Sequence, residues 1–245
     1  MGMQKGCLSH RGKIADWVIT KPSYWPNMIY NTRITGVGAY NKIKDIIGYI
    51  RDKVAPPFWI ITPETDRLVE STLENSGMMA IDLLTGMAID LKIFSNKYYG
   101  KKISNDLNII EVSSAGQLSH WLEIVNKVIF KGKKLNQELF SGLIGNPSIH
   151  FYTGYVGNVP AATSMSFINT PSAGFYNIAT LPAFRKRGFG TAMTAYSMIE
   201  AGNKGCTTGI LHASLMGNPV YLKMGYKPYG EYKVFWMAGK EYRYY

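Results

Sequence analysis

Cysteine and histidine are scarce in this sequence, and their scarcity excludes several kinds of site. Cys7 and Cys206 are the only cysteines, and two cysteines so far apart make neither a disulfide scaffold nor a zinc site. No two of the four histidines are spaced like a pair of metal ligands on one helix. We therefore expect no metal, and a reducing cytoplasm is the expected compartment.

Long apolar runs are also missing. No stretch approaches the ~20 residues that a transmembrane helix needs, and the N-terminal segment lacks the apolar core of a signal peptide. The chain starts Met-Gly, but Gly6 stands where the myristoylation pattern requires Ser or Thr. These absences predict a protein without a membrane partner.

Acidic residues are few compared with basic ones. Lys and Arg number 27 against 16 Asp and Glu, which gives a formal net charge of +11. Such a charge favours an anionic partner: a nucleotide-like cofactor, nucleic acid or a membrane face. The lysines are scattered, however, as on any soluble surface, and no long basic run indicates a nucleic-acid arm. Nucleic acid is therefore not the expected partner.

A chain of 245 residues is long enough for two domains. The polar, basic segment 96–106 predicts a boundary, with an N-terminal α/β domain over residues 1–102 and a second domain over residues 103–245. In the first part, apolar residues at helical spacing predict a helix. They are Ile43, Ile46, Ile47, Ile50 and Val54. We further expect a strand at 58–62, a helix from Pro63 to Gly77 and a strand at 86–94.

The second part predicts strands separated by helices. Strands are expected at 107–112, 173–181 and 209–214, and a hairpin turns at Gly157-Asn158. Helices are expected around Trp121, near 135–143, from 188 to 201 and before Gly225. Alternation of strands and helices, combined with hairpins, predicts a mixed α/β sheet.

The segment "RKRGFGTA", residues 185–192, concentrates three cations and two glycines before an apolar helix. Positive charge at a helix start is unfavourable unless an anion offsets it. Gly188 and Gly190 let the backbone approach a ligand closely, and the amides of a first helical turn bind phosphate. The turn therefore predicts a diphosphate site. The alternative is a solvated basic turn whose glycines serve packing.

A second motif follows the first. The turn is neither a Walker loop nor a dinucleotide fingerprint, but it matches R-x-x-G-x-G/A through Arg185, Gly188 and Gly190. Downstream, "ASLMGNPVYLKMGY" carries the Ser, small residue and Tyr of the pattern's second half. These are Ser214, Gly217 and Tyr221. Together the two motifs resemble the GNAT superfamily of acyl-CoA-dependent N-acetyltransferases over residues 106–238.

The resemblance implies a mixed, mostly antiparallel central sheet flanked by helices, here with an additional N-terminal α/β domain. It implies that strands 175–180 and 209–213 separate, and that acetyl-CoA enters the gap and is attacked directly by an amine in a ternary complex. The cofactor-binding residues that it implies are Ile178, Ala179, Thr180, Arg185, Lys186, Arg187, Gly188, Phe189, Gly190, Thr191 and Ser214.

Tyr221 has the position of the family's general acid. A phenol with a pKa near ~10 can protonate a leaving thiolate, whose conjugate acid has a pKa near ~8.5, in a dry site. The alternative is an ordinary core aromatic. The Glu or His that family members often use as a base is missing from residues 175–180. The base is therefore left unassigned; a water, or one of several residues that also have structural explanations, could serve. Those residues are Glu111, His150, His212 and Glu231.

The N-terminal part has the same strand–helix–glycine order as the second motif. Leu73 stands four residues before Gly77, as Tyr221 stands before Gly225, which suggests a degenerate GNAT-like half; the alternative is that any strand–helix pair looks similar. The expected function is acetyl transfer from acetyl-CoA to a small-molecule or peptide amine. Rival interpretations are a non-catalytic acyl-CoA-binding module and a basic nucleic-acid- or ribosome-associated protein. The acceptor and the oligomeric state stay open.

Overall fold

The computed structural model describes residues 6–20, 23–34, 38–98 and 106–237. The chain forms two compact units: unit 1 comprises Met1–Thr85 and Gly230–Tyr245, and unit 2 comprises Gly86–Tyr229. The predicted boundary at residues 102/103 lies outside the described residues; the two units meet at Thr85/Gly86, and residues 230–245 belong to unit 1. No helix in the described part is long and apolar enough to cross a membrane.

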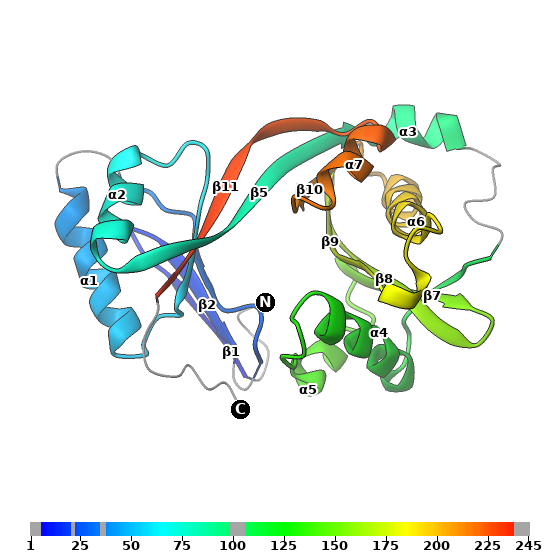
Figure 1. Ribbon diagram of the computed structural model, residues 1–245, viewed down its shortest axis with the longest axis horizontal. Coiled ribbons are helices and arrows are strands. Elements are labelled where there is room, and N and C mark those ends of the chain that lie inside the picture. The colour runs from blue at the N-terminus through cyan, green and yellow to red at the C-terminus, as the bar shows by residue number, and fades with distance from the viewer. Residues whose placement is uncertain (1–5, 21–22, 35–37, 99–105, 238–245) are drawn as a thin grey trace. The chain divides into compact units, whose positions relative to one another are not determined.

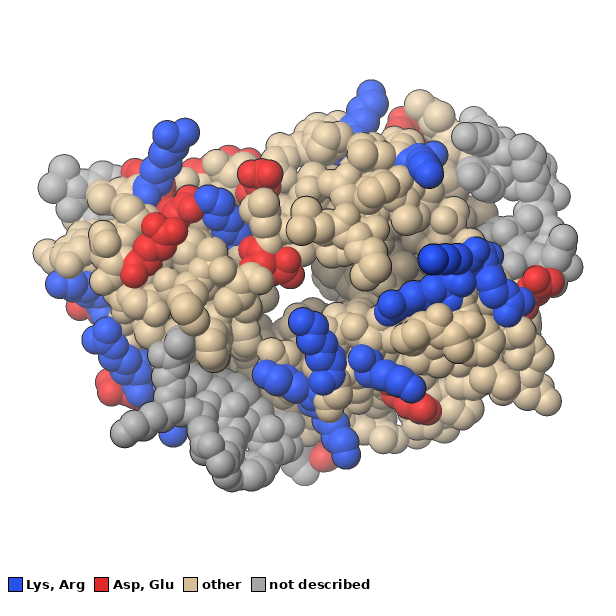
Figure 2. Space-filling model, in the orientation of Figure 1, with Lys and Arg blue, Asp and Glu red and all other residues tan. Residues whose placement is uncertain are grey.

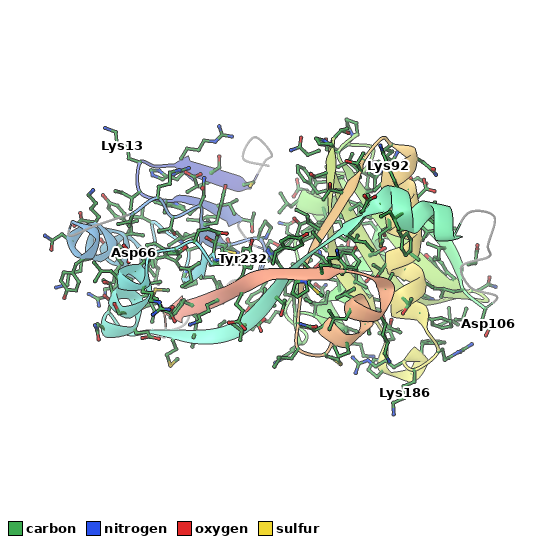
Figure 3. All side chains as sticks on the ribbon, turned by 90° about the horizontal axis from the view of Figure 1, so that it is seen from above. Lys13, Asp66, Lys92, Asp106, Lys186 and Tyr232 are labelled. Carbon is green, nitrogen blue, oxygen red and sulfur yellow. The ribbon has the colours of Figure 1, made fainter. Side chains whose placement is uncertain are left out.

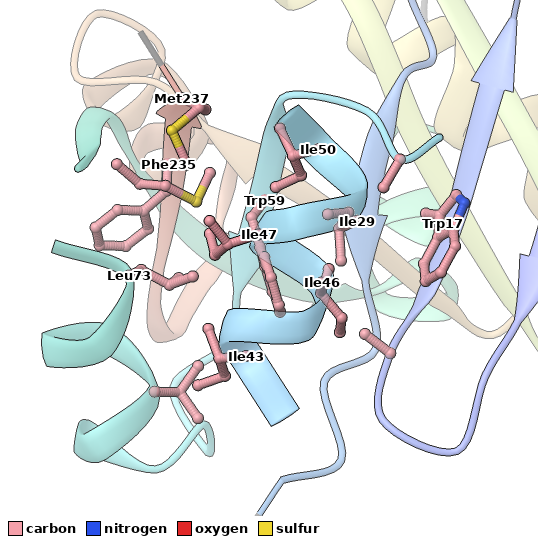
Figure 4. Close-up of a cluster of buried hydrophobic side chains, with 14 of the residues drawn as sticks. Trp17, Ile29, Ile43, Ile46, Ile47, Ile50, Trp59, Leu73, Phe235 and Met237 are labelled. Atoms are coloured by element: carbon pink, nitrogen blue, oxygen red, sulfur yellow. The ribbon is translucent and has the colours of Figure 1, made fainter. Parts of the chain in front are cut away.

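Unit 1 contains a sheet with the strand order β1-β2-β3-β4-β11-β5. Its elements are β1 (Cys7–Arg11), β2 (Asp16–Thr20), β3 (Met28–Tyr30), α1 (Ala39–Arg51), β4 (Phe58–Ile61), α2 (Arg67–Asn75) and parts of β5 (Met78–Asp90) and β11 (Lys227–Met237). The predicted apolar helix is α1. Four of its isoleucines pack around Trp59 of β4, together with Phe235 of β11 (Figure 4). Val54 lies beyond the helix end and is 55% exposed.

Two local expectations for this part of the chain were wrong, and the short strands β1 to β3 were not predicted. Helix α2 begins at Arg67 rather than Pro63, because Asp66 Oδ1 accepts a hydrogen bond from the Leu68 amide at 2.9 Å and caps it. The strand expected at 86–94 is the end of β5, and it stops at Asp90. There Asp90 Oδ1 accepts from the Lys92 and Ile93 amides, at 2.8 and 3.1 Å, and starts α3 (Leu91–Tyr98).

Unit 2 continues the strand order as β11-β5-β10-β9-β8-β7-β6 (Figure 1). Its further elements are β6 (Asn108–Glu111), α4 (Ala115–Val128), α5 (Gln137–Ser141), β7 (Ile149–Val156), β8 (Val159–Asn169), β9 (Ser172–Thr180), the 3-10 turn η1 (Pro182–Phe184), α6 (Phe189–Asn203), β10 (Thr208–Ala213) and α7 (Asn218–Met224). Strands β6 to β9 pair antiparallel, and β9 pairs with β10 in parallel. The predicted mixed, mostly antiparallel sheet flanked by helices is confirmed.

Helices α4 and α6 cover opposite faces of this sheet. On the α4 face, Trp121 packs against Phe151, and its Nε1 donates to the carbonyl of Ser164 at 3.0 Å. On the α6 face, the hydroxyls of Ser164 and Ser197 lie 2.8 Å apart, and both residues are fully buried. Since side chains alternate along a strand, these contacts fix which face each neighbouring residue presents.

Candidate functional site

Strands β9 and β10 separate after three paired residues. Thr208, Gly209 and Ile210 pair with Ser172, Ala173 and Gly174, and the register ends there although both strands continue. Over residues 175–180, β9 therefore keeps β8 as a partner on one side and has no paired strand on the side of β10. The gap expected between residues 175–180 and 209–213 is thus present in the sheet.

A β-bulge lies just beyond the point of separation. Thr163 pairs with Ala179 and Met165 with Tyr176, so β9 carries one more residue than β8 across this step. Asn177 takes a positive φ of 50°, and its carbonyl accepts a hydrogen bond from Thr163 Oγ1 at 3.0 Å. A bulge bends its strand and increases the local twist, which explains why β9 turns away from β10.

Two aromatic rings cover the last paired residues, one on each face. On the α6 face, a Cβ on Gly209 would come within 2.8 Å of the Phe175 ring. On the opposite face, a Cβ on Gly174 would come within 2.6 Å of the Tyr176 hydroxyl. Only glycine fits beneath either ring. The gap therefore ends at the tightly packed residues Gly174 and Gly209, where β9 and β10 are still paired.

The basic turn, residues 185–191, connects β9 to α6 at the separated end. Lys186 and Gly188 both have positive φ, 63° and 78°, and Arg185 Nε donates to the carbonyl of Thr180 at 3.2 Å. Arg187 lies over the Phe189 ring at 4.7 Å, and its guanidinium is 3.4 Å from Asp106 Oδ2. The Lys186 side chain points away from unit 2 (Figure 3). These backbone angles and contacts fold the turn over the start of α6.

The start of α6 is open. No described side chain caps it, and its first turn has no acidic residue. A Cβ added to Gly190 would have Thr180 Oγ1, at 3.9 Å, as its nearest neighbour in the described chain, so packing does not require a glycine there. The space that such a Cβ would fill lies beside amides that a helix cannot satisfy itself. The residues present thus fit a diphosphate at this turn.

The strands and helices around the gap carry almost no negative charge. Glu200 is the single acidic residue between Glu138 and Glu231, and it lies near Tyr152 and Tyr196 on the α6 face. In the view of Figure 2, basic side chains gather on unit 2 in groups that few acidic ones interrupt. A diphosphate at the basic turn would therefore meet little repulsion from this stretch.

Tyr221 lies on α7 against the α6 side of β10. Its side chain packs with Leu211 and Ala213, and its ring makes an edge contact with Tyr226, with ring centres 5.7 Å apart. A Cβ on Gly217, one turn earlier, would come within 2.9 Å of the Tyr221 ring. Gly217 thus sets the position of this ring, a contact that the i,i+4 helical spacing could have revealed. Burial raises the pKa of Tyr221 to about 12.

The other predicted residues lie where the gap opens. Ile178 packs at the margin of the apolar cluster around α6, Ala179 is buried, and Thr180 forms the last rung with β8. Ser214 directly follows β10, and its Oγ accepts a hydrogen bond from the Gly217 amide at 3.3 Å. That contact stabilises the turn into α7 and leaves the hydroxyl proton available as a donor.

The four candidate bases lie in different places. Glu111 and His150 bind each other, with Oε1 and Nδ1 2.6 Å apart, on β6 and β7. His150 Nε2 faces the Pro147 carbonyl at 3.1 Å, so both of its nitrogens are engaged. Glu231 belongs to unit 1. His212, on β10 beside the gap, is the one of the four that the described structure places at the site.

Comparison with solved structures identifies the fold. The chain resembles a GCN5-related N-acetyltransferase from Kribbella flavida with a TM-score of 0.72 and 14% identity, over 95% of this chain and 90% of that one. It resembles a tandem GNAT protein from the clavulanic acid biosynthesis pathway with a TM-score of 0.63 and 9% identity, over 93% and 79% of the two chains. A conserved protein of unknown function from Staphylococcus epidermidis matches with a TM-score of 0.65 and 15% identity, over 94% and 93%.

No protein-family model and no curated protein matches the sequence. The structural similarities nevertheless extend over nearly the whole chain, and the chain has the GNAT acetyltransferase fold. The resemblance inferred from the two sequence motifs is confirmed at the level of the fold.

Proposed function

We propose that unit 2 binds acetyl-CoA and transfers its acetyl group to an amine in a ternary complex. The observation that carries this proposal is the start of α6: an uncapped helix with an open glycine and three cations, next to strands that separate. The diphosphate would bind the amides and cations of residues 185–191. The pantetheine arm would follow the unpaired edge of β9 at Ile178, Ala179 and Thr180, with Ser214 as a hydrogen-bond donor.

Tyr221 would protonate the thiolate that leaves. Because burial raises the pKa of its phenol to about 12, the group is protonated at every pH near neutrality. The same apolar surroundings would also raise the pKa of the leaving thiol, since desolvation disfavours a charged sulfur. A backbone amide of β9 would meanwhile donate to the thioester oxygen as its negative charge develops.

Two alternatives predict different measurements. A non-catalytic module would bind acetyl-CoA without turning it over with any amine. A nucleic-acid-binding protein would show an RNA affinity that falls steeply with salt. The GNAT fold and the buried Tyr221 favour the enzyme over both. A small-molecule or peptide acceptor and a cytoplasmic location stay predictions.

Titration calorimetry with CoA tests the proposal through two matched glycines. Gly190 and Gly116 are each the second residue of a helix, and a Cβ on Gly116 would meet nothing within 4 Å. Gly190→Val should weaken CoA binding at least about tenfold, since losing one charge-assisted hydrogen bond costs ~1.5–3 kcal/mol. Gly116→Val should leave the affinity unchanged. Equal affinities for both variants, or no CoA binding by the wild type, would contradict the proposed site.

A further inference from the structure

We propose that the acceptor is an apolar monoamine, an alkylamine or arylalkylamine with a single ammonium group, and that polyamines and other polycations are poor acceptors. The inference rests on the proposed acetyl transfer and names the class of amine that the same site takes. It is carried by the side of β10 that borders the gap and by the turn that follows, which are exposed, largely apolar and free of acidic residues.

One face of the gap is filled by the chain itself. Alternation along β10 directs Gly209, Leu211 and Ala213 towards α6 and α7, and all three are buried. Ile210 and His212 therefore point to the opposite face, where both are exposed. Helix α4 lies on that opposite face and packs against β7, β8 and β9. The face of β10 that carries Ile210 is thus the side from which an amine would reach the gap.

The turn after β10 adds two exposed apolar side chains. The carbonyl of Ser214 accepts a hydrogen bond from the Gly217 amide at 3.0 Å, so the chain bends at the two residues between them. These are Leu215 and Met216, which are 83% and 75% exposed, and Ile210 is 42% exposed. We call Ile210, Leu215 and Met216 the acceptor surface. Clustered apolar side chains that the chain leaves uncovered are typical of a ligand-binding site.

The polar side chains that flank the acceptor surface are not acidic. His212 follows Ile210 on the same face of β10. Tyr176 reaches this face from β9, where it lies over Gly174, the partner of Ile210. Burial raises the pKa of the Tyr176 phenol and lowers the pKa of the His212 imidazole. Neither group therefore carries a negative charge near neutral pH.

The acidic residues on the neighbouring elements of unit 2 are Asp90 and Glu200. Asp90 lies beside the start of β10, the end furthest from the turn, and its Oδ1 already accepts from two amides of α3. Glu200 lies on the α6 face, near Tyr152 and Tyr196. A second ammonium group at the acceptor surface would thus leave water without gaining a counter-charge, which is unfavourable. An alkyl chain there would remove apolar area from water, which is favourable.

The transfer step is the one given for the proposed function. The amine nitrogen forms a bond to the acetyl carbon, the carbon–sulfur bond breaks, and the departing sulfur takes the proton of Tyr221. The proton that the nitrogen loses passes to water, and exchange with water restores the proton on Tyr221. The alkyl chain of the amine would rest on the acceptor surface during this step.

The test uses three primary amines with the full chain: propylamine, hexylamine and 1,6-diaminohexane. Their amino groups have similar basicity, so differences in rate report on the rest of the molecule. Each buried methylene contributes up to about fourfold, so kcat/KM for hexylamine should exceed that for propylamine at least about tenfold. The value for 1,6-diaminohexane should lie at least about tenfold below that for hexylamine. Thiol release from acetyl-CoA measures all three.

Leu215→Glu supplies the negative charge that the acceptor surface lacks. It should shift the ratio of kcat/KM for hexylamine to that for 1,6-diaminohexane at least about tenfold towards the diamine. Leu222→Glu is the matched control, because Leu222 is 49% exposed on α7, on the α6 side of the sheet. Its ratio should stay within about twofold of the wild type. Since both amines react with the same acetyl-CoA complex, a change in CoA affinity cancels in the ratio.

Calorimetry with CoA separates the two ways of failing. If the wild type does not bind CoA, the proposed function fails and this inference falls with it. If CoA binds but the diamine reacts as well as hexylamine, or the two Leu→Glu variants shift the ratio equally, the inference alone fails. Where no amine is acetylated, calorimetry of the same amines with the CoA-saturated protein should give the same order of affinities. No binding, or tighter binding of the diamine, overturns the inference.

Discussion

Helices α2 and α6 begin in opposite ways. Asp66 caps α2 and Glu70 lies in its first turn, so negative charge from the chain itself meets the positive end of the helix dipole. At α6 a glycine stands at the cap, cations precede it, and no acid lies in the first turn. The chain itself thus supplies negative charge to the start of α2 but not to the start of α6. Helix α1 also begins at a glycine, Gly38, without a side-chain cap or an acid in its first turn, so the cations that precede α6 are what set this helix apart.

The same contrast holds for other charges. In unit 1, Asp16 binds Arg33, with Oδ2 and a guanidinium nitrogen 2.6 Å apart, and Glu70 binds Lys233. In unit 2, the cations of the basic turn have one described acidic partner, Asp106, at 3.4 Å from Arg187, and both of those side chains are well exposed. Exposed pairs of this kind contribute little. Most of the positive charge of the turn is therefore not compensated by the described residues.

The comparison extends to Leu73 and Tyr221, each of which stands four residues before a glycine; the largest effect is expected there. Leu73 is fully buried in the core of unit 1, whereas Tyr221 belongs to the apolar cluster around α6 and carries a hydroxyl. Tyr221→Phe keeps the ring and should lower kcat by ~10²–10⁴ with little change in CoA affinity. Steady-state kinetics with an accepted amine measures this fall in kcat.

Tyr226→Phe is the control for that experiment. Tyr226 contacts the ring of Tyr221, and its own buried hydroxyl has no hydrogen-bond partner in the described chain. Removing this hydroxyl should leave kcat unchanged. Equal losses in the two variants would return Tyr221 to a packing role and make it a true counterpart of Leu73.

A medium effect is expected when α6 is made to resemble α2. Thr191→Glu places a carboxylate in the first turn of α6, as Glu70 does in α2. Two like charges a few ångströms apart repel by more than ~1.4 kcal/mol, so CoA affinity should fall at least about tenfold. The helix itself should gain ~0.3–1 kcal/mol. Thr191→Gln, which is neutral, separates charge from size in calorimetry and thermal unfolding; an equal loss with Gln would point to size.

The smallest effect is expected when α2 is made to resemble α6. Asp66→Ala removes the cap on the Leu68 amide and should lower the free energy of unfolding of unit 1 by ~1 kcal/mol. CoA affinity should not change. Hydrogen exchange of the α2 amides measures the loss, and Asp45→Ala, on the exposed face of α1, is the control. A change in CoA affinity would show that the two helix ends are not independent.

The sequence predicts those parts of the site that depend on neighbouring residues. Gly188, Gly190 and the cations are neighbours in the chain, so the sequence alone predicts that they form one turn. The bulge at Asn177 depends on how β9 pairs with β8 near Thr163. The residue pattern of β9 alone does not predict it. The position of His212 relative to Tyr221 follows from strand alternation, but only once β10 is known to border the gap.

The same limit applies to the fold. The order of elements in unit 2 was largely predictable, because its helices and hairpins carry strong periodic and turn signals. In unit 1, strands β1 to β3 are short, and their burial depends on packing with distant residues such as Trp59. Nothing local in the closing strand indicates that its last residues pair with β4, where Phe235 lies opposite Trp59.

That return of β11 constrains the order in which the chain can fold. Phe235 and Met237 belong to the core of unit 1, yet they come after every residue of unit 2 in the chain. Chains generally fold from the N-terminus as they are synthesised, but unit 1 cannot complete its core until nearly the whole of unit 2 has emerged. The acetyltransferase-like unit is thus the first to be finished, and the N-terminal unit is the last.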